Sequence, residues 1–231
     1  MIEGADVSWD KVALDLETHG FAVIGPLLHD RQCAEMSAMF HDDDRFRQSV
    51  SLSERGFGAG RYRYFANPVP PLVTRLRQLC YAPLADIVNR WTPWRGEHEF
   101  PATLEDMVTR CRTAGQNEPA PLLLRFATDD YNCLHQDIYG SVAFPLQLVV
   151  MLSRPGVDFE GGEFVLMEQV PGQEPRPRIV TAPRGCAIVF PTRSRVLTAN
   201  GVAGVADVSH GVASVRSGER YTLGVIFHEA S

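Results

Sequence analysis

The sequence predicts an α+β protein whose helical N-terminal half precedes a β-sandwich or jelly roll. Two observations predict this class. Before residue 121, apolar residues recur mostly at helical spacing. From Leu122 onward, short apolar runs alternate with turns rich in Gly, Pro and Asp, giving seven or eight strands in about 110 residues. We therefore expect one domain over 1–231, with a mainly helical layer at 1–121 and a β core at 122–231.

Four segments of the N-terminal half show local patterns. Residues 9–18 and 103–113 are predicted helices, and residues 30–40 place Cys33, Met36 and Phe40 on one helical face. Residues 20–28 are predicted to form a strand that ends in a turn.

The remaining N-terminal segments are predicted as a loop, a broken helix and a turn. An acidic, Gly-rich loop is expected from His41 to Gly60. The apolar stripe from Val73 to Trp91 predicts a helix in two pieces, because Pro83 interrupts one helix and suits the first turn of another. Residues 116–121 read as a turn that leads into the β half. Strands are expected at 122–127, 131–138, 143–152, 163–168, 177–182, 186–190, 205–212 and 220–227.

Composition and charge narrow the class of protein. The 231 residues are 45% hydrophobic and 22% charged, as in ordinary globular proteins, and the formal net charge is −6. This balance excludes a broad electrostatic attraction to nucleic acid or anionic lipid, although a local basic patch remains compatible with it. The N-terminus lacks the features of a signal peptide, and no apolar run is long enough to span a bilayer.

The cysteines indicate a reducing compartment. There are five, an odd number, and none forms a CxxC pair, so neither a disulfide framework nor a zinc site is predicted. We expect a cytoplasmic protein.

The segment from Tyr131 to Asp137 contains two candidate metal ligands. Residues two apart on a strand point to the same face, so His135 and Asp137 are expected to project together, as are Tyr131 and Cys133. His210 lies on a strand predicted far downstream, from which it could complete a three-ligand set. Two imidazoles and one carboxylate leave three octahedral positions open and are typical of non-haem Fe(II), whereas zinc more often takes N and S ligands in a tetrahedron.

A second candidate site lies at the start of the last predicted strand. Arg220 and Thr222 share a face there, and a guanidinium beside a hydroxyl is a good receptor for a carboxylate. The alternative is a surface arginine at the mouth of a strand.

The order of several motifs resembles the Fe(II)/2-oxoglutarate-dependent dioxygenase superfamily, in particular its prolyl 4-hydroxylase-like branch. These motifs are HQD at 135–137, FEGGEF at 159–164, PRGCAIVF at 183–190, His210 and RYT at 220–222. The resemblance covers residues 122–229. The segments GAGRYRYF at 58–65 and VNRW at 88–91 are similar to a group of bacterial 2-oxoglutarate oxygenases.

This resemblance implies a double-stranded β-helix and a set of site residues. It implies that His135, Asp137 and His210 hold Fe(II), and that Arg220 and Thr222 bind the far carboxylate of 2-oxoglutarate. It assigns to Tyr131 a hydrogen bond to the same co-substrate. The reaction would consume O2 and 2-oxoglutarate, release succinate and CO2, and hydroxylate a C–H bond.

Three hypotheses for the substrate follow. The first is a protein side chain or a small molecule. The second is a methyl group on alkylated nucleic acid, which the alternating basic and aromatic residues Arg61–Phe65 favour and the acidic net charge disfavours. The third is a non-catalytic barrel that senses 2-oxoglutarate. For Gln147, a polar side chain in a very apolar strand, we expect either a position facing the iron or a bond to the backbone.

Overall fold

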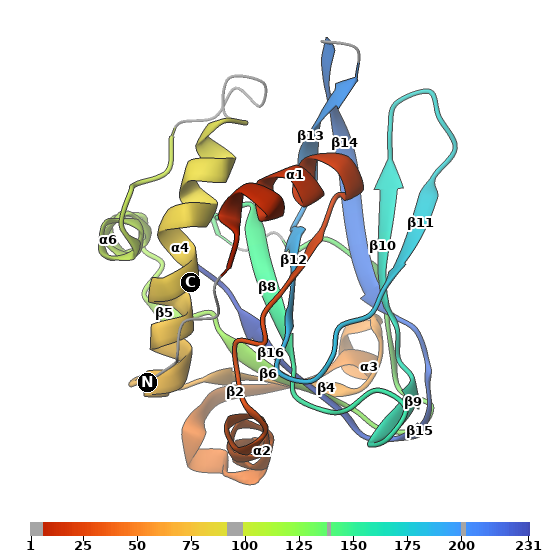
Figure 1. The fold of residues 1–231 in the computed structure, drawn as a ribbon. Helices are drawn as coiled ribbons and strands as arrows, with labels where there is room; N and C mark the ends of the chain where they lie inside the picture. The colour runs from red at the N-terminus through yellow and green to blue at the C-terminus, as the bar shows by residue number, and fades with distance from the viewer. Residues whose placement is uncertain (1–6, 92–98, 138–139, 200–201) are drawn as a thin grey trace.

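The architecture described below comes from a computed structural model, which describes residues 7–91, 99–137, 140–199 and 202–231. Two antiparallel sheets face each other, and helices cover the outer face of the larger one (Figure 1). Within the described residues the larger sheet has seven strands, ordered β1-β12-β8-β16-β6-β4-β2. Their bounds are Ala22–Ile24, Ala187–Pro191, Leu146–Met151, Arg220–Val225, Leu122–Phe126, Arg61–Phe65 and Phe46–Ser51.

The smaller sheet closes the barrel and carries its long hairpins. Its order is β11-β10-β14-β7-β3, with β13 paired to β14. The bounds are Arg176–Val180, Phe164–Gln169, Val202–Val212, Tyr131–His135, Gly58–Ala59 and Ser194–Ala199. Two short pairs lie apart from both sheets: β15 (Val215–Gly218) with β9 (Phe159–Gly161), and β17 (Glu229–Ala230) with β5 (Glu118–Pro119).

Side-chain caps mark the start of α1 (Trp9–His19) and α6 (Leu104–Thr113). In α1 the Ser8 side chain accepts a hydrogen bond from the Lys11 backbone, and Gly20 ends the helix with φ 81°. In α6 Thr103 caps in the same way. The other helices are α2 (Asp30–Ala38), α3 (Leu52–Arg55), α4 (Pro71–Asn89), and the 3₁₀ turns η1 (Met39–His41) and η2 (Asp43–Arg45).

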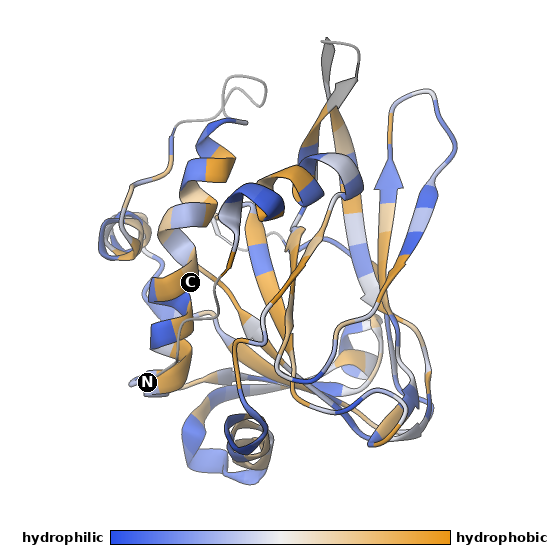
Figure 2. Ribbon diagram, viewed as in Figure 1, coloured by the Kyte–Doolittle hydropathy of each residue, from blue (hydrophilic) through white to orange (hydrophobic). Residues whose placement is uncertain are grey.

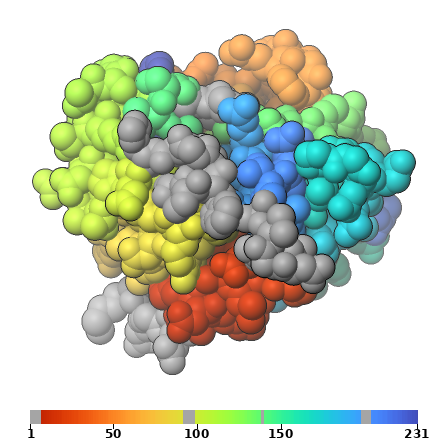
Figure 3. Space-filling view, turned by 90° about the horizontal axis from the view of Figure 1, so that it is seen from above, coloured from red at the N-terminus to blue at the C-terminus, as the bar shows by residue number. Residues whose placement is uncertain are grey.

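Two cores lie on the two faces of the large sheet. On its outer face Leu223 and Val225 of β16 pack with the helices, and on its inner face Ile188 and Phe190 of β12 pack against the small sheet. Figure 2 shows this division, with mainly orange strands at the centre and helices that are orange on one side and blue on the other. Seen from above, α1 (red), α4 and α6 (yellow to yellow-green) lie on one side, and the β10–β11 hairpin (cyan) lies on the other (Figure 3).

The fold confirms most of the predicted elements and corrects two. The expected loop from His41 to Gly60 is wrong, because β2 and α3 occupy much of it and β2 is the edge strand of the large sheet. The predicted break near Pro83 is also wrong. The helix α4 runs through it unbroken, and its buried stripe, including Leu76, Cys80 and Leu84, packs in the main core and offsets the lost backbone hydrogen bond. No helix in the described ranges is long and apolar enough to cross a membrane.

Candidate active site

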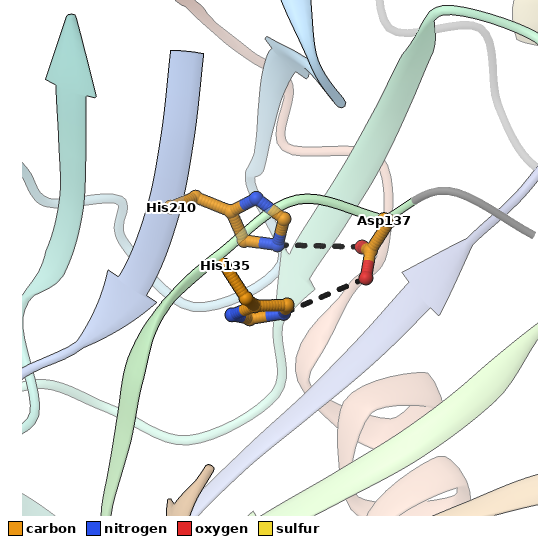
Figure 4. Close-up of side chains that lie close together, drawn as sticks. All are labelled: His135, Asp137 and His210. Atoms are coloured by element: carbon orange, nitrogen blue, oxygen red, sulfur yellow. Dashed lines mark ion pairs between the residues drawn. The ribbon is translucent and has the colours of Figure 1, made fainter.

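Three potential metal ligands converge inside the barrel. One ligand atom each from His135, Asp137 and His210 lies within 4.8 Å of the others. His135 ends β7, Asp137 follows it, and His210 on β14 is paired in register with His135 (Figure 4). The sequence-predicted set is therefore brought together in space.

A β-bulge separates the predicted face of β7 from the observed one. Between the pairs His210↔His135 and Val212↔Asn132, β14 advances two residues while β7 advances three. Asn132 therefore lines the pocket with His135, whereas Tyr131 is 42% exposed and does not line it. The expected inward position of Tyr131 and Cys133 is wrong for this reason; the Cys133 side chain is also exposed.

Hydrogen bonds orient the three side chains. His135 Nδ1 lies 2.8 Å from the Cys133 carbonyl oxygen, which can only accept, so this nitrogen carries the proton and leaves Nε2 free as a ligand. The Nε2 atoms of His135 and His210 lie 3.5 and 3.3 Å from the two carboxylate oxygens of Asp137. Gln147 donates from Nε2 to Asp137 Oδ2 at 2.6 Å, which settles its orientation: the side chain faces the cluster.

The environment of His210 is apolar and enclosed. Its ring is stacked near Phe164, with centroids 5.8 Å apart and an interplanar angle of 25°, and lies 4.8 Å from the ring of Phe190. His210 is only 6% exposed, and its Nδ1 is buried without a hydrogen-bond partner in the described part of the chain.

Electrostatics in the cluster favour an ionised carboxylate. Burial raises the pKa of Asp137, but the charge of His210 and hydrogen bonds from both imidazoles outweigh it and hold this pKa well below its usual range. Burial lowers the pKa of His210. For His135, burial acts in the same direction, but the hydrogen bond and charge of Asp137 prevail, so its pKa is raised.

A buried cation lies in the same cavity as the three clustered side chains. Arg220 is 1% exposed, and its Nε and Nη2 have no hydrogen-bond partner within the described residues. Burial lowers its pKa to about 10, and its guanidinium carbon lies 5.7 Å from the Phe126 ring centroid. Thr222, on the same face of β16, is also 1% exposed. The alternative of a surface arginine is therefore wrong for Arg220.

A single cavity of about 940 Å³ connects these groups. This volume is near the upper end of the roughly 300–1,000 Å³ typical of ligand sites, so it has room for a co-substrate and part of a second molecule. Its lining includes the three clustered side chains, Arg220 and Thr222, and, on the far side, residues of β2, β4 and β6.

The alternating segment Arg61–Phe65 forms β4 and divides between the two faces of the sheet. Tyr62 and Tyr64 line the cavity. Arg63 points the other way, donating to the Phe40 carbonyl at 2.7 Å and to Asp43 at 2.6 Å. No local signal distinguishes these two tyrosines from core residues, because the cavity beside them is built from strands remote in sequence.

Comparisons with known proteins identify a family for this chain. Residues 60–230 match a family model, Oxygenase-NA, described as an oxygenase catalysing oxidative methylation of damaged DNA. An uncharacterized protein of Mycobacterium tuberculosis is 41% identical over 192 residues, which covers 81% of this chain and 82% of that protein.

Solved structures share the fold. A 2OG-Fe(II) oxygenase family oxidoreductase from Burkholderia pseudomallei has a TM-score of 0.57 at 18% identity, covering 98% of this chain and 94% of that one. A Pseudomonas putida prolyl-4-hydroxylase has a TM-score of 0.55 at 15% identity, covering 94% and 96%. The chain belongs to the Oxygenase-NA family of oxygenases, and it shares the fold of these 2OG-Fe(II) oxygenase and prolyl-4-hydroxylase structures.

Proposed function

We propose that His135, Asp137 and His210 hold the Fe(II) of this oxygenase, and that Arg220 with Thr222 binds the far carboxylate of 2-oxoglutarate. One observation carries the proposal. Two imidazole nitrogens and a carboxylate converge in a cavity that also contains a buried guanidinium with unpartnered N–H groups. A buried cation without a partner is costly, and a bound dicarboxylate would supply the missing charge.

The donor set fits ferrous iron. With both imidazoles deprotonated at Nε2, as metal binding requires, it offers two neutral nitrogen ligands and one ionised carboxylate, the combination that leaves three octahedral positions for other ligands. Both Nε2 atoms point toward Asp137, as expected when the three groups share one ion (Figure 4). The donor set contains no thiolate, because the Cys133 side chain is exposed.

The chain's own residues position and shield the reacting groups. Bound Fe(II) supplies the activation of O2, coupled to conversion of 2-oxoglutarate into succinate and CO2. Gln147 holds the Asp137 carboxylate in one orientation, and the Cys133 carbonyl does the same for the His135 ring. Phe164 and Phe190 keep water from the buried side of His210.

The product of this chemistry is a hydroxylated C–H bond of a second substrate. A protein side chain or small molecule would keep the new hydroxyl. An N-methyl group on a nucleobase would become a hydroxymethyl group and leave as formaldehyde. The description of the matched family, which names damaged DNA, favours the nucleic-acid substrate as a second candidate.

Anaerobic calorimetry tests the assigned residues. Wild type should bind Fe(II) and then 2-oxoglutarate, and Asp137→Ala should lose Fe(II) binding. Asp44→Ala is a matched control, because this exposed carboxylate lies in η2 outside the cluster. Retention of wild-type Fe(II) affinity by the Asp137 variant would refute the ligand assignment.

A parallel assay separates the substrate classes. Enzyme with Fe(II), 2-oxoglutarate and O2 is incubated with N-methylated single-stranded DNA or with a peptide library. Succinate and formaldehyde are measured against a no-iron control. Formaldehyde formation with the DNA selects the nucleic-acid hypothesis, and its absence removes that hypothesis.

We also propose that the protein acts in the cytoplasm. All five cysteines are free, and ferrous iron persists best in a reducing compartment. Fractionation of producing cells followed by immunoblotting tests this placement; recovery outside the cytoplasmic fraction would contradict it.

A further inference from the structure

One wall of the cavity is apolar. A third hydrophobic cluster, which shares Tyr62 and Leu124 with the inner core, consists of seven residues, and every one of them lines the cavity. We call this set the apolar shelf. Its members are Tyr62, Tyr64, Ala120, Leu122, Leu124, Ile226 and Ala230.

Strand register makes the shelf continuous with the proposed co-substrate site. Tyr62 is paired with Leu124, which is paired in turn with Thr222 of β16. In the next row Leu122 is paired with Gly224, and a Cβ at position 224 would lie 3.3 Å from the Leu122 side chain. The missing side chain therefore keeps the path open between Thr222 and the shelf.

The rings of Tyr62 and Tyr64 differ in whether a face is open to a ligand. The rings stand nearly perpendicular, at 88°, with centroids 5.5 Å apart. The Arg47 guanidinium covers the Tyr64 ring at 4.8 Å and is fixed by two 3.1 Å hydrogen bonds to the Pro119 carbonyl. Tyr62 carries no such cover and is only half-buried, so its ring is the aromatic surface left for a ligand.

A cation and two amides line the cavity together with Tyr62. Arg55, at the end of α3, is exposed, lines the cavity and makes no ion pair within the described residues. Burial raises the pKa of the Tyr62 hydroxyl, while the charge of Arg55 lowers it and that of Asp137 raises it, and all three residues line the same cavity. Gln48 and Asn132 also line the cavity and can each donate and accept hydrogen bonds.

We propose that the apolar shelf binds one nucleobase of a single-stranded nucleic acid, stacked on Tyr62, with Arg55 receiving a neighbouring phosphate. This inference rests on the proposed function and names its substrate. Aromatic side chains stack on bases of any sequence, and guanidinium groups match phosphate geometry. Alkylation at a ring nitrogen gives the base a positive charge, which the π face of a neutral tyrosine attracts.

The shelf fits a nucleotide better than an apolar peptide side chain. A prolyl or leucyl group would use the aliphatic part of the shelf but leave Arg55 and the amides of Gln48 and Asn132 without partners. The net charge of −6 disfavours the long electrostatic contact that a duplex would make, so a short single strand is the better fit.

Binding measurements under anaerobic conditions test this assignment. Enzyme loaded with Fe(II) and 2-oxoglutarate is titrated into a fluorescein-labelled pentanucleotide with one N1-methyladenine, and anisotropy is read. Tyr62→Ala should weaken binding about tenfold or more, as expected for loss of a stacked base, whereas Tyr62→Phe should stay within about threefold. Arg55→Ala should weaken binding and reduce its salt dependence by about one phosphate contact.

Arg61→Ala is the matched control for charge. Arg61 is an exposed arginine next to Tyr62 on β4 that does not line the cavity, so its removal should leave pentanucleotide affinity unchanged. Equal affinity of wild type and Tyr62→Ala, with 2-oxoglutarate binding intact, would overturn the shelf proposal. The shelf proposal would also be overturned if a proline-containing peptide displaced the pentanucleotide and Tyr62→Ala did not change pentanucleotide affinity. That result would assign the shelf to a peptide. Failure of wild type to bind 2-oxoglutarate would count against the proposed function itself.

Discussion

At the scale of single residues, the groups next to each proposed metal ligand fix its orientation. Asp137 has each of its oxygens near an imidazole, and Oδ2 also accepts from Gln147. The sequence predicted His135 and Asp137 because HxD is a local pattern, and it predicted His210 from the order of motifs shared with the dioxygenase superfamily. It left the orientation of Gln147 open, because nothing local shows that β8 passes beside the segment after β7.

The hydrogen bond from Gln147 should tune the metal site. Gln147→Leu removes the donor to Asp137 while the cavity keeps its shape, so Fe(II) affinity should fall about 10- to 100-fold, the usual cost of losing such a partner. Anaerobic Fe(II) titration measures this. Gln48→Leu changes another amide in the cavity that makes no contact with the cluster, and it should leave Fe(II) affinity unchanged. An unchanged affinity in Gln147→Leu would show that the bond has no influence.

Arg220 should oppose folding and favour co-substrate binding. Arg220→Met removes charge-assisted hydrogen bonds worth about 1.5–3 kcal/mol, so 2-oxoglutarate affinity should fall roughly 10- to 150-fold. Because it also removes an unpaired buried cation, the ligand-free variant should be more stable than wild type in urea.

Arg216→Met provides the comparison for that experiment. Arg216 is 65% exposed in its side chain and lies 3.6 Å from Glu163, so neither affinity nor stability should change. Loss of 2-oxoglutarate affinity in the Arg216 variant rather than in Arg220→Met would transfer the carboxylate-binding role to Arg216.

At the scale of elements, the β7 bulge shows where sequence periodicity stops being informative. A period of two places Tyr131 beside His135, but one extra residue in β7 exchanges the faces and brings Asn132 inward. The partner strand carries the only trace of the bulge. A Cβ at Gly211, next to His210, would lie 2.6 Å from the Asn132 carbonyl oxygen.

The edge strand β2 was missed for a related reason. Its six residues, FRQSVS, bury only Val50, so they show no apolar alternation of their own. Pairing with β4, a contact remote from either local pattern, makes them a strand. The predicted helices at 9–18, 30–40 and 103–113 were found because each carries its own apolar stripe.

A buried arginine that forms an ion pair within the barrel also binds the helix α1. Arg195 donates to Glu168 at 2.6 Å and to the carbonyls of Leu16 and Glu17 near the end of α1. Glu168→Leu leaves a buried cation, so it should lower the free energy of unfolding by about 3–5 kcal/mol. The double variant Glu168→Leu/Arg195→Met should recover much of that loss. Urea denaturation of both measures it, and equal destabilisation of the two would argue against a charge effect.

At the scale of the whole molecule, the jelly roll could be predicted because its strands are short, evenly spaced and separated by turns. The cavity could not, since it lies between strands whose paired residues are about 60 to 100 positions apart in the sequence, such as β4, β6 and β16. One buried group also links the stability of the molecule to pH. His228 is 2% exposed, and burial, with Arg77 nearby, lowers its pKa to about 4.

Protonation of His228 should contribute to acid unfolding. The unfolded chain takes up this proton near pH 6.5 and the folded chain only near pH 4. Stability should therefore be unaffected above about pH 7 and decline as pH falls from about 6.5 to 4, by at most about 3 kcal/mol. Urea unfolding at several pH values should show a shallower decline for His228→Asn than for wild type. His19→Asn, an exposed histidine, should follow wild type, and identical slopes for all three would exclude the effect.

The buried guanidinium of Arg220, whose Nε and Nη2 lack hydrogen-bond partners among the described residues, also bears on how fast the protein is degraded. A ligand that binds only the folded chain stabilises it by RT ln(1 + [L]/Kd), about 2.7 kcal/mol at a hundredfold excess over Kd. Cellular 2-oxoglutarate, an intermediate of central metabolism, would then set the fraction of chains exposed to proteases. When the concentration of 2-oxoglutarate falls, less of the protein would be stabilised by the ligand. Its abundance would then fall together with its turnover, because more chains would be unfolded and open to proteolysis.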